Sequence, residues 1–137
     1  MASPLQTALA AEYAASWGYD VVGGKLPTSQ QAWARAAQAA HRARATATAA
    51  AITAAGETPV GPAATYTLPI AVSGATSAMR LAVRLEDGTA AAWHFVLNAD
   101  TAHRRLAADA LTTCAVTATR WRIRGAQSPA TQAFPGT

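Results

Sequence analysis

The segment Glu57–Ser73, with the sequence ETPVGPAATYTLPIAVS, decides how this chain of 137 residues folds. Its prolines, Pro59, Pro62 and Pro69, interrupt helical hydrogen bonding, and the segment lies between two long stretches with helical patterns. A connection of this length is unusual between adjacent antiparallel helices, but it suits a crossover that runs the length of a helical bundle. The helices on either side of residues 57–73 are therefore predicted to be parallel.

Two helices are predicted before the crossover. Ser3 is a suitable cap and Pro4 suits the first position of a helix over residues 4–25. A second helix is predicted over residues 29–55, with Gly56 as its stop signal. The proline-containing turn between these helices is short, so they are expected to be antiparallel neighbours.

The stretch after the crossover supports two interpretations. Apolar residues alternate with other residues around Val83, and Asp87-Gly88 is a strong hairpin-turn signal. A competing helical pattern runs from Met79 to Leu97, and the alanines at positions 90–92 favour helix over strand. We prefer one helix over residues 75–98.

A last helix is predicted over residues 101–124, capped by Asp100 and stopped by Gly125. Residues 126–137 form a proline-containing tail in which Phe134 is available to pack. No internal repeat or second domain is found in the sequence. The predicted architecture is an all-α four-helix bundle in a single domain over residues 1–137.

Three ionisable residues interrupt the apolar stripes of three different predicted helices: Glu12, His41 and Glu86. An isolated buried charge is very costly, so such groups either bind a metal or neutralise one another. In a metal-free polar network, a protonated His41 would lie between the two carboxylates. Gln38, Arg44 and Tyr19 are placed to support such a network. A mononuclear metal site using the same three residues remains the alternative.

Short motifs in the first three predicted helices, the crossover and the C-terminal tail give a family resemblance. The chain resembles the ferritin-like superfamily, and within it a family of ferritin-like domains of unknown function from high-GC bacteria. The resemblance covers nearly the whole chain and rests on the following segments: Glu12-Tyr13, AAHRAR at residues 39–44, YTLP at residues 66–69, Leu85-Glu86-Asp87 and AFPG at residues 133–136.

The resemblance implies a ferritin-like fold with a degenerate metal site. Ferritin-like di-iron proteins carry a first-helix Glu, a second-helix Glu-x-x-His and a third-helix Glu, which match Glu12, His41 and Glu86. The bridging position holds Gln38, whose neutral carboxamide cannot bridge two hard cations as a carboxylate does. In the fourth helix, Asp109 is predicted to point outward.

We therefore expect a protein of unknown biochemical function, a non-catalytic binding or structural module without catalytic residues or a cofactor. The alternative is a metal-binding ferritin-like protein that uses iron or another divalent metal. Such a protein would hold a mononuclear site, or the di-iron site of an oxidase or iron-storage protein.

Composition bears on self-association and on nucleic-acid binding. The chain is 51% hydrophobic, largely through alanine, with a formal net charge of +4. Alanine-rich helix faces bury little area per residue, so a homodimer packed through alanine-rich and Trp-bearing faces is expected. Lys25 is the only lysine among 11 basic residues. This arginine bias is typical of high-GC codon usage and gives no indication of nucleic-acid binding.

Other reactive residues have structural interpretations. Cys114 is the only cysteine and lies in an apolar stripe, which favours a buried thiol. His94 and His103 have no partner at ligand spacing, and the four tryptophans are expected in the core or a dimer interface. The sequence predicts no membrane span and a cytoplasmic location. The sequence does not identify a protein or small-molecule partner.

Overall fold

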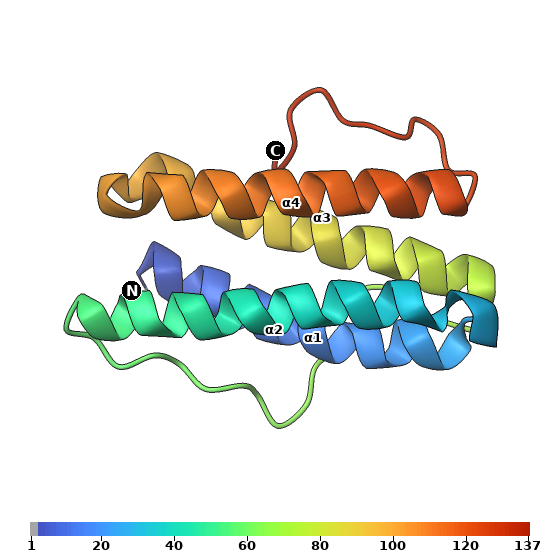
Figure 1. The fold of residues 1–137 in the computed structure, drawn as a ribbon, viewed down its shortest axis with the longest axis horizontal. Helices are drawn as coiled ribbons and strands as arrows, with labels where there is room; N and C mark the ends of the chain where they lie inside the picture. The colour runs from blue at the N-terminus through green and yellow to red at the C-terminus, as the bar shows by residue number, and fades with distance from the viewer. Residues whose placement is uncertain (1–2) are drawn as a thin grey trace.

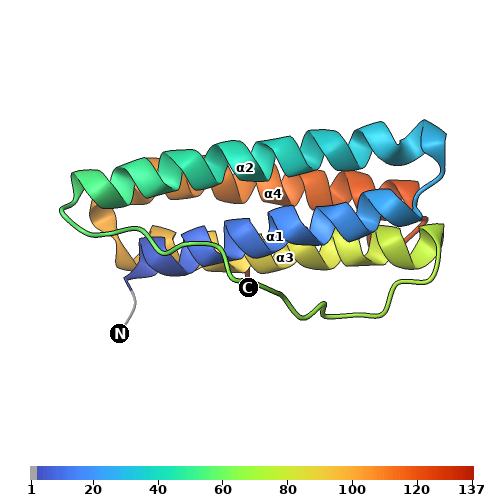
Figure 2. The same ribbon diagram turned by 90° about the horizontal axis from the view of Figure 1, so that it is seen from below.

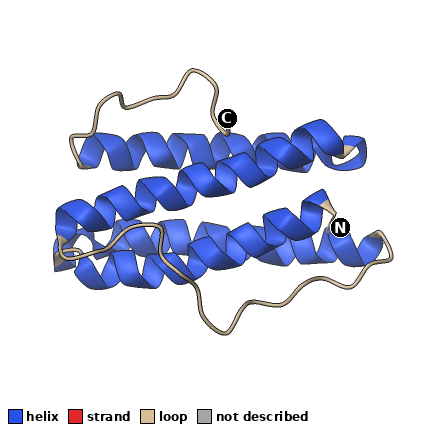
Figure 3. Ribbon diagram, turned by 180° about the vertical axis from the view of Figure 1, so that it is seen from behind, coloured by secondary structure: helices blue, strands red, loops and turns tan. Residues whose placement is uncertain are grey.

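The computed structural model describes residues 3–137, and within this range all regular secondary structure is helical (Figure 3). Two short 3₁₀ turns, η1 and η2, lead into the second and fourth helices. The elements are α1 (Pro4–Lys25), η1 (Thr28–Gln30), α2 (Gln31–Ala54), α3 (Ala75–Ala99), η2 (Thr101–His103) and α4 (Arg104–Arg124).

The four long helices lie side by side as two antiparallel pairs, α1 with α2 and α3 with α4 (Figure 1). Helix α1 also packs along α3, which joins the pairs. The connection from α2 to α3 returns along the outside of the molecule, so α2 and α3 run in the same direction (Figure 2). The parallel relation predicted for the helices that flank the crossover is therefore confirmed.

Helix α3 is continuous from Ala75 to Ala99, so the helical prediction for residues 75–98 is confirmed and the alternative hairpin is wrong. Asp87 and Gly88 lie inside this helix, not in a turn. The buried positions, which include Ala82, Glu86 and Trp93, recur with helical spacing. Packing of that face therefore overrides the local turn preference of the Asp-Gly pair.

Gln6 holds the start of the crossover against α1. Gln6 Nε2 donates to the Thr58 carbonyl at 2.8 Å, and the Val60 amide donates to Gln6 Oε1 at 2.9 Å. Further along, the Tyr66 ring lies 5.6 Å from the ring of Trp17 in α1. These contacts fix an extended segment that has no backbone ladder of its own.

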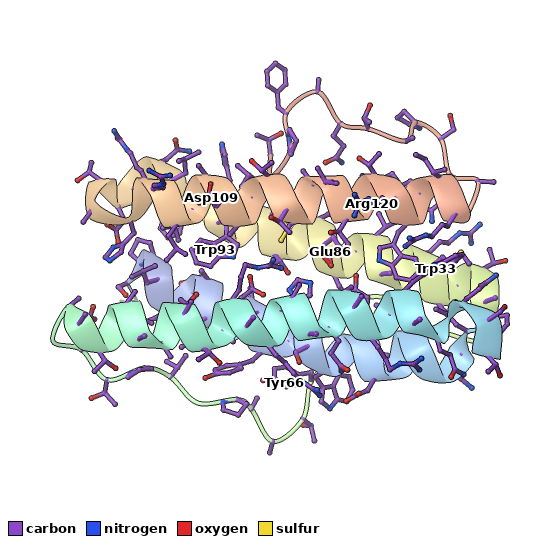
Figure 4. All side chains as sticks on the ribbon, in the orientation of Figure 1. Trp33, Tyr66, Glu86, Trp93, Asp109 and Arg120 are labelled. Carbon is purple, nitrogen blue, oxygen red and sulfur yellow. The ribbon has the colours of Figure 1, made fainter. Side chains whose placement is uncertain are left out.

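The apolar core consists of two clusters of buried side chains. One surrounds Tyr19, Leu81 and Trp121, and the other surrounds Leu9 and Trp93. The charged residues in the interior lie between these clusters, near the middle of the helices (Figure 4). No helix in residues 3–137 combines the length and apolar character needed to cross a membrane.

The C-terminal tail arches away from the end of α4 and returns to the α3–α4 pair (Figure 1). Phe134 is 75% exposed, so this ring is not docked in the core. The returning end is close-packed instead through Gly136, where an added Cβ would lie 2.8 Å from the Ala90 carbonyl oxygen.

Candidate functional site

Three helices each place one ionisable side chain at the centre of the molecule. Glu12 comes from α1, His41 from α2 and Glu86 from α3, and their exposed fractions are 0%, 0% and 1%. The apolar residues that flank each of them in sequence fix the buried face of its helix, which forces the charged residue inward as well. The structure thus brings together the three residues that interrupt the apolar stripes.

His41 lies between the two carboxylates. Its Nδ1 is 2.6 Å from Glu12 Oε2, and its Nε2 is 2.6 Å from Glu86 Oε2. The two nitrogens are on opposite edges of the imidazole ring, so the two carboxylates are on opposite sides of it. A ring protonated on both nitrogens donates a charge-assisted hydrogen bond to each carboxylate. Arg44 Nη2 also lies 3.0 Å from Nδ1.

Glu12 is bound through both oxygens. Arg44 Nε donates to Glu12 Oε1 at 2.8 Å, and Trp93 Nε1 donates to the same oxygen at 2.7 Å. The second oxygen accepts from His41. Such donors stabilise a carboxylate in a low-dielectric interior, where it would otherwise be strongly disfavoured.

Glu86 shares a single oxygen between two donors. Tyr19 Oη donates to Glu86 Oε2 at 2.7 Å, the oxygen that also accepts from His41. Trp121 Nε1 in turn donates to Tyr19 Oη at 3.0 Å. The Tyr19 ring stacks on the His41 imidazole with centroids 5.5 Å apart. Hydrogen bonds therefore run continuously from Trp121 through the centre to Trp93.

The charges in this network balance. Glu12 and Glu86 carry two negative charges, while a protonated His41 and Arg44 carry two positive ones. Burial works to lower the pKa of His41, but its hydrogen bonds to both glutamates outweigh burial and raise the pKa to about 9. Burial likewise works to raise the pKa of Glu12, and the bonds and charges of His41 and Arg44 lower it below its usual range.

Two neighbouring groups remain neutral. Burial and the adjacent Glu86 charge hold the pKa of Tyr19 well above its usual range, so its hydroxyl keeps the proton that it donates. Burial, followed by the charge of Glu86, raises the pKa of Cys114. The Cys114 thiol lies 3.5 Å from an Arg44 nitrogen and is fully buried, which suits a structural residue more than a nucleophile.

Gln38 occupies a different environment from the other predicted site residues. Its side chain is largely buried, but Nε2 donates to the Ser16 carbonyl at 2.7 Å and to Asp20 Oδ1 at 2.8 Å. The structure therefore does not bring Gln38 into hydrogen bonding with Glu12, His41 or Glu86. Its carboxamide links α2 to α1 at the rim of the interior.

The three side chains bond directly to one another and are not spaced as ligands around a common ion. A histidine ligand binds a metal through one ring nitrogen and usually donates its other N–H to a carboxylate, carbonyl or water outside the ligand shell. Here both ring nitrogens face a carboxylate, and the two carboxylates lie on opposite sides of the ring. Across residues 3–137, no group of three or more His, Cys, Asp or Glu side chains is arranged to hold a metal ion.

The remaining candidates lie outside this network. Asp109 is exposed on α4, and His94 Nε2 lies 3.4 Å from Asn98 Nδ2 on α3. His103 Nδ1 lies 2.8 Å from Asp100 Oδ2 at the start of η2. None of these groups reaches the interior.

Sequence reasoning missed the two tryptophans that close the network at its ends. Trp93 and Trp121 were expected as apolar core or interface residues, yet each donates its indole N–H to a central polar group. A signal for Trp93 was present, since it lies seven residues after Glu86 and hence on the same helix face. Trp121, near the C-terminal end of α4, had no comparable signal.

The fold and the site together define an all-α protein of four packed helices with a charge-balanced network at its centre. Within that class, the chain belongs to the family described as Domain of unknown function (DUF4439), whose model matches residues 4–137. It is also similar to the crystal structure of a conserved hypothetical protein, rv2844, from Mycobacterium tuberculosis. The TM-score is 0.87, with 39% sequence identity over 96% of this chain and 94% of that chain. No curated protein matches the chain.

Proposed function

We propose that this chain is a ferritin-like four-helix bundle in which a metal-free charge network replaces the metal centre. In this proposal it acts as a non-catalytic binding or structural module. The helix order supports the ferritin-like assignment, because a long crossover joins two parallel helices between two antiparallel pairs. The ferritin-like assignment is further supported because Glu12, His41 and Glu86 come from α1, α2 and α3 in turn.

The bridging geometry of His41 carries the proposal. Each ring nitrogen is 2.6 Å from a different glutamate, which leaves no nitrogen lone pair free when the ring is protonated. Arg44 then completes the charge balance at Glu12. A guanidinium and an imidazolium together supply the two positive charges that two buried carboxylates require.

The rival function is a ferritin-like metal protein, with iron or another divalent metal in a mononuclear or di-iron site. Metal analysis of protein purified without chelator separates the two proposals. A metal-free network predicts no stoichiometric metal and a melting temperature unchanged by added Fe²⁺, Mn²⁺ or Zn²⁺. Near-stoichiometric iron or manganese, with a metal-dependent rise in melting temperature, would contradict it. Oxygen consumption on adding ferrous ion would favour the di-iron alternative.

A homodimer remains part of the proposal, although Trp93 and Trp121 do not contribute to its interface. Trp93 and Trp121 are fully buried in the chain itself, and Trp33 packs edge-on against Trp121 at 6.2 Å. The exposed apolar side chains that remain for association include Phe95 and Ile123. Light scattering after size-exclusion chromatography should give twice the chain mass, and a monomer at all concentrations would contradict a dimer.

A cytoplasmic location also remains a proposal. The free, buried Cys114 is compatible with a reducing compartment. Fractionation of cells that express the natural protein tests this location directly.

A further inference from the structure

A cleft on the outer side of the α3–α4 pair is separate from the buried network. Its volume is about 460 Å³, which lies within the range of about 300–1,000 Å³ typical of small-molecule sites. Helices α3 and α4 form its floor, and the tail forms its roof. The lining residues that matter for binding include Asp87, Arg120, Arg122 and Gln132.

The roof of the cleft is anchored at its far end. Gly136 has a φ of +84°, a conformation that residues with a Cβ seldom adopt. An added Cβ at this position would also lie 2.8 Å from the Ala90 carbonyl oxygen and 2.8 Å from His94 Cβ. Glycine at position 136 therefore lets the tail pack closely on α3 beside the cleft.

The walls of the cleft combine an apolar surface with an excess of positive charge. Ala90, Val116 and Pro135 supply the apolar surface. Arg122 is paired with Asp87, so these two lining charges cancel. Arg120 is exposed and has no ion-pair partner among residues 3–137. One guanidinium thus remains for a ligand.

We propose that this cleft binds a small monocarboxylate with a short apolar chain. The carboxylate would pair with Arg120, since guanidinium and carboxylate form strong charge-assisted hydrogen bonds. The apolar chain would pack on Val116 and Ala90 under the tail. A dianion fits less well, because only one guanidinium is unpaired and the Asp87 carboxylate lines the same space.

The test uses the full chain with sodium octanoate as the probe, and octylamine as a probe of equal chain length and opposite charge. Amide chemical shifts are followed during each titration. Octanoate should bind and shift the amides of Val116, Gln132 and their neighbours, and octylamine should not. Arg120→Gln should weaken octanoate binding at least fivefold. Its matched control is Arg105→Gln, an exposed arginine of α4 outside the cleft, which should leave the affinity unchanged.

Two further variants test the apolar floor and the roof. Val116→Glu places a carboxylate in the cleft and should abolish octanoate binding, while Gly136→Ala should weaken it by releasing the tail. Melting temperatures measured alongside establish that each variant is folded. The proposal is overturned if octanoate shifts no lining amide at millimolar concentration, if octylamine binds equally well, or if Arg120→Gln and Arg105→Gln behave alike.

Discussion

Replacing His41 with alanine tests how the interior charges are held. The imidazole makes two hydrogen bonds of 2.6 Å, one to each glutamate. A hydrogen bond to a charged group contributes about 1.5–3 kcal/mol, and removal of one partner from a buried ion pair costs about 3–5 kcal/mol. The substitution destabilises the two carboxylates unequally, because Glu12 keeps its hydrogen bonds from Arg44 and Trp93.

The penalty therefore falls mainly on Glu86, which keeps the hydroxyl of Tyr19. We expect His41→Ala to lower the free energy of unfolding by about 3–5 kcal/mol, the value for one broken buried pair and not for two. Urea denaturation at pH 7, followed by circular dichroism, measures this change. The matched control is His103→Ala, which removes a half-exposed histidine from its pair with Asp100 and should cost less than about 1 kcal/mol.

A double variant distinguishes stranded charge from lost packing. Adding Glu86→Gln to His41→Ala removes the uncompensated charge, so the double variant should be more stable than His41→Ala alone. The reasoning is refuted if His41→Ala lies within 1 kcal/mol of the wild type. It is also refuted if the double variant is no more stable than the single one.

Three further predictions follow from the same structure. Because the pKa of His41 is raised from 6.5 to about 9, its stabilisation is fully present below pH 6.5 and is lost as pH rises through about 9. Urea denaturation should show that the free energy of unfolding falls by about 3 kcal/mol as the pH rises through this range. The fall should be absent in His41→Gln. Gly18→Ala should be about 1 kcal/mol less stable than Gly24→Ala, since an added Cβ at Gly18 lies 2.7 Å from a terminal methyl of Leu85 and displaces that side chain, whereas Gly24 has open space. Equal melting temperatures for the two would contradict this. Gln6→Ala should cost about 1–3 kcal/mol and speed proteolysis within the crossover; unchanged cleavage would count against the anchoring role of Gln6.

The elements of the fold were largely predictable from local signals. Ser3 accepts from the Gln6 amide as a helix cap, and Lys25 ends α1 where expected. Helices α2 and α4 begin two or three residues later than predicted, because 3₁₀ turns precede them. The Asp87-Gly88 pair favoured a hairpin locally, but the helical pattern from Met79 to Leu97 and the alanines at positions 90–92 correctly favoured helix.

The central charges were predictable for the same reason as the helices. A charged residue within an apolar stripe must face inward, which located Glu12, His41 and Glu86. The direction of a side chain at the rim was not predictable. Gln38 lies one turn from His41 on α2, yet its amide is drawn to acceptors on α1. Periodicity gives the face of a helix but not the partner that a flexible side chain selects.

The central claim is that His41 is an imidazolium held between two carboxylates without a metal. Nitrogen-15 NMR of protein labelled at the histidine ring nitrogens tests it most directly. At pH 7 the account predicts that both Nδ1 and Nε2 of His41 carry slowly exchanging protons, and that added Zn²⁺ or Mn²⁺ leaves both signals unchanged. A ring with a single N–H proton, or one whose signals shift or disappear with stoichiometric metal, would contradict the account.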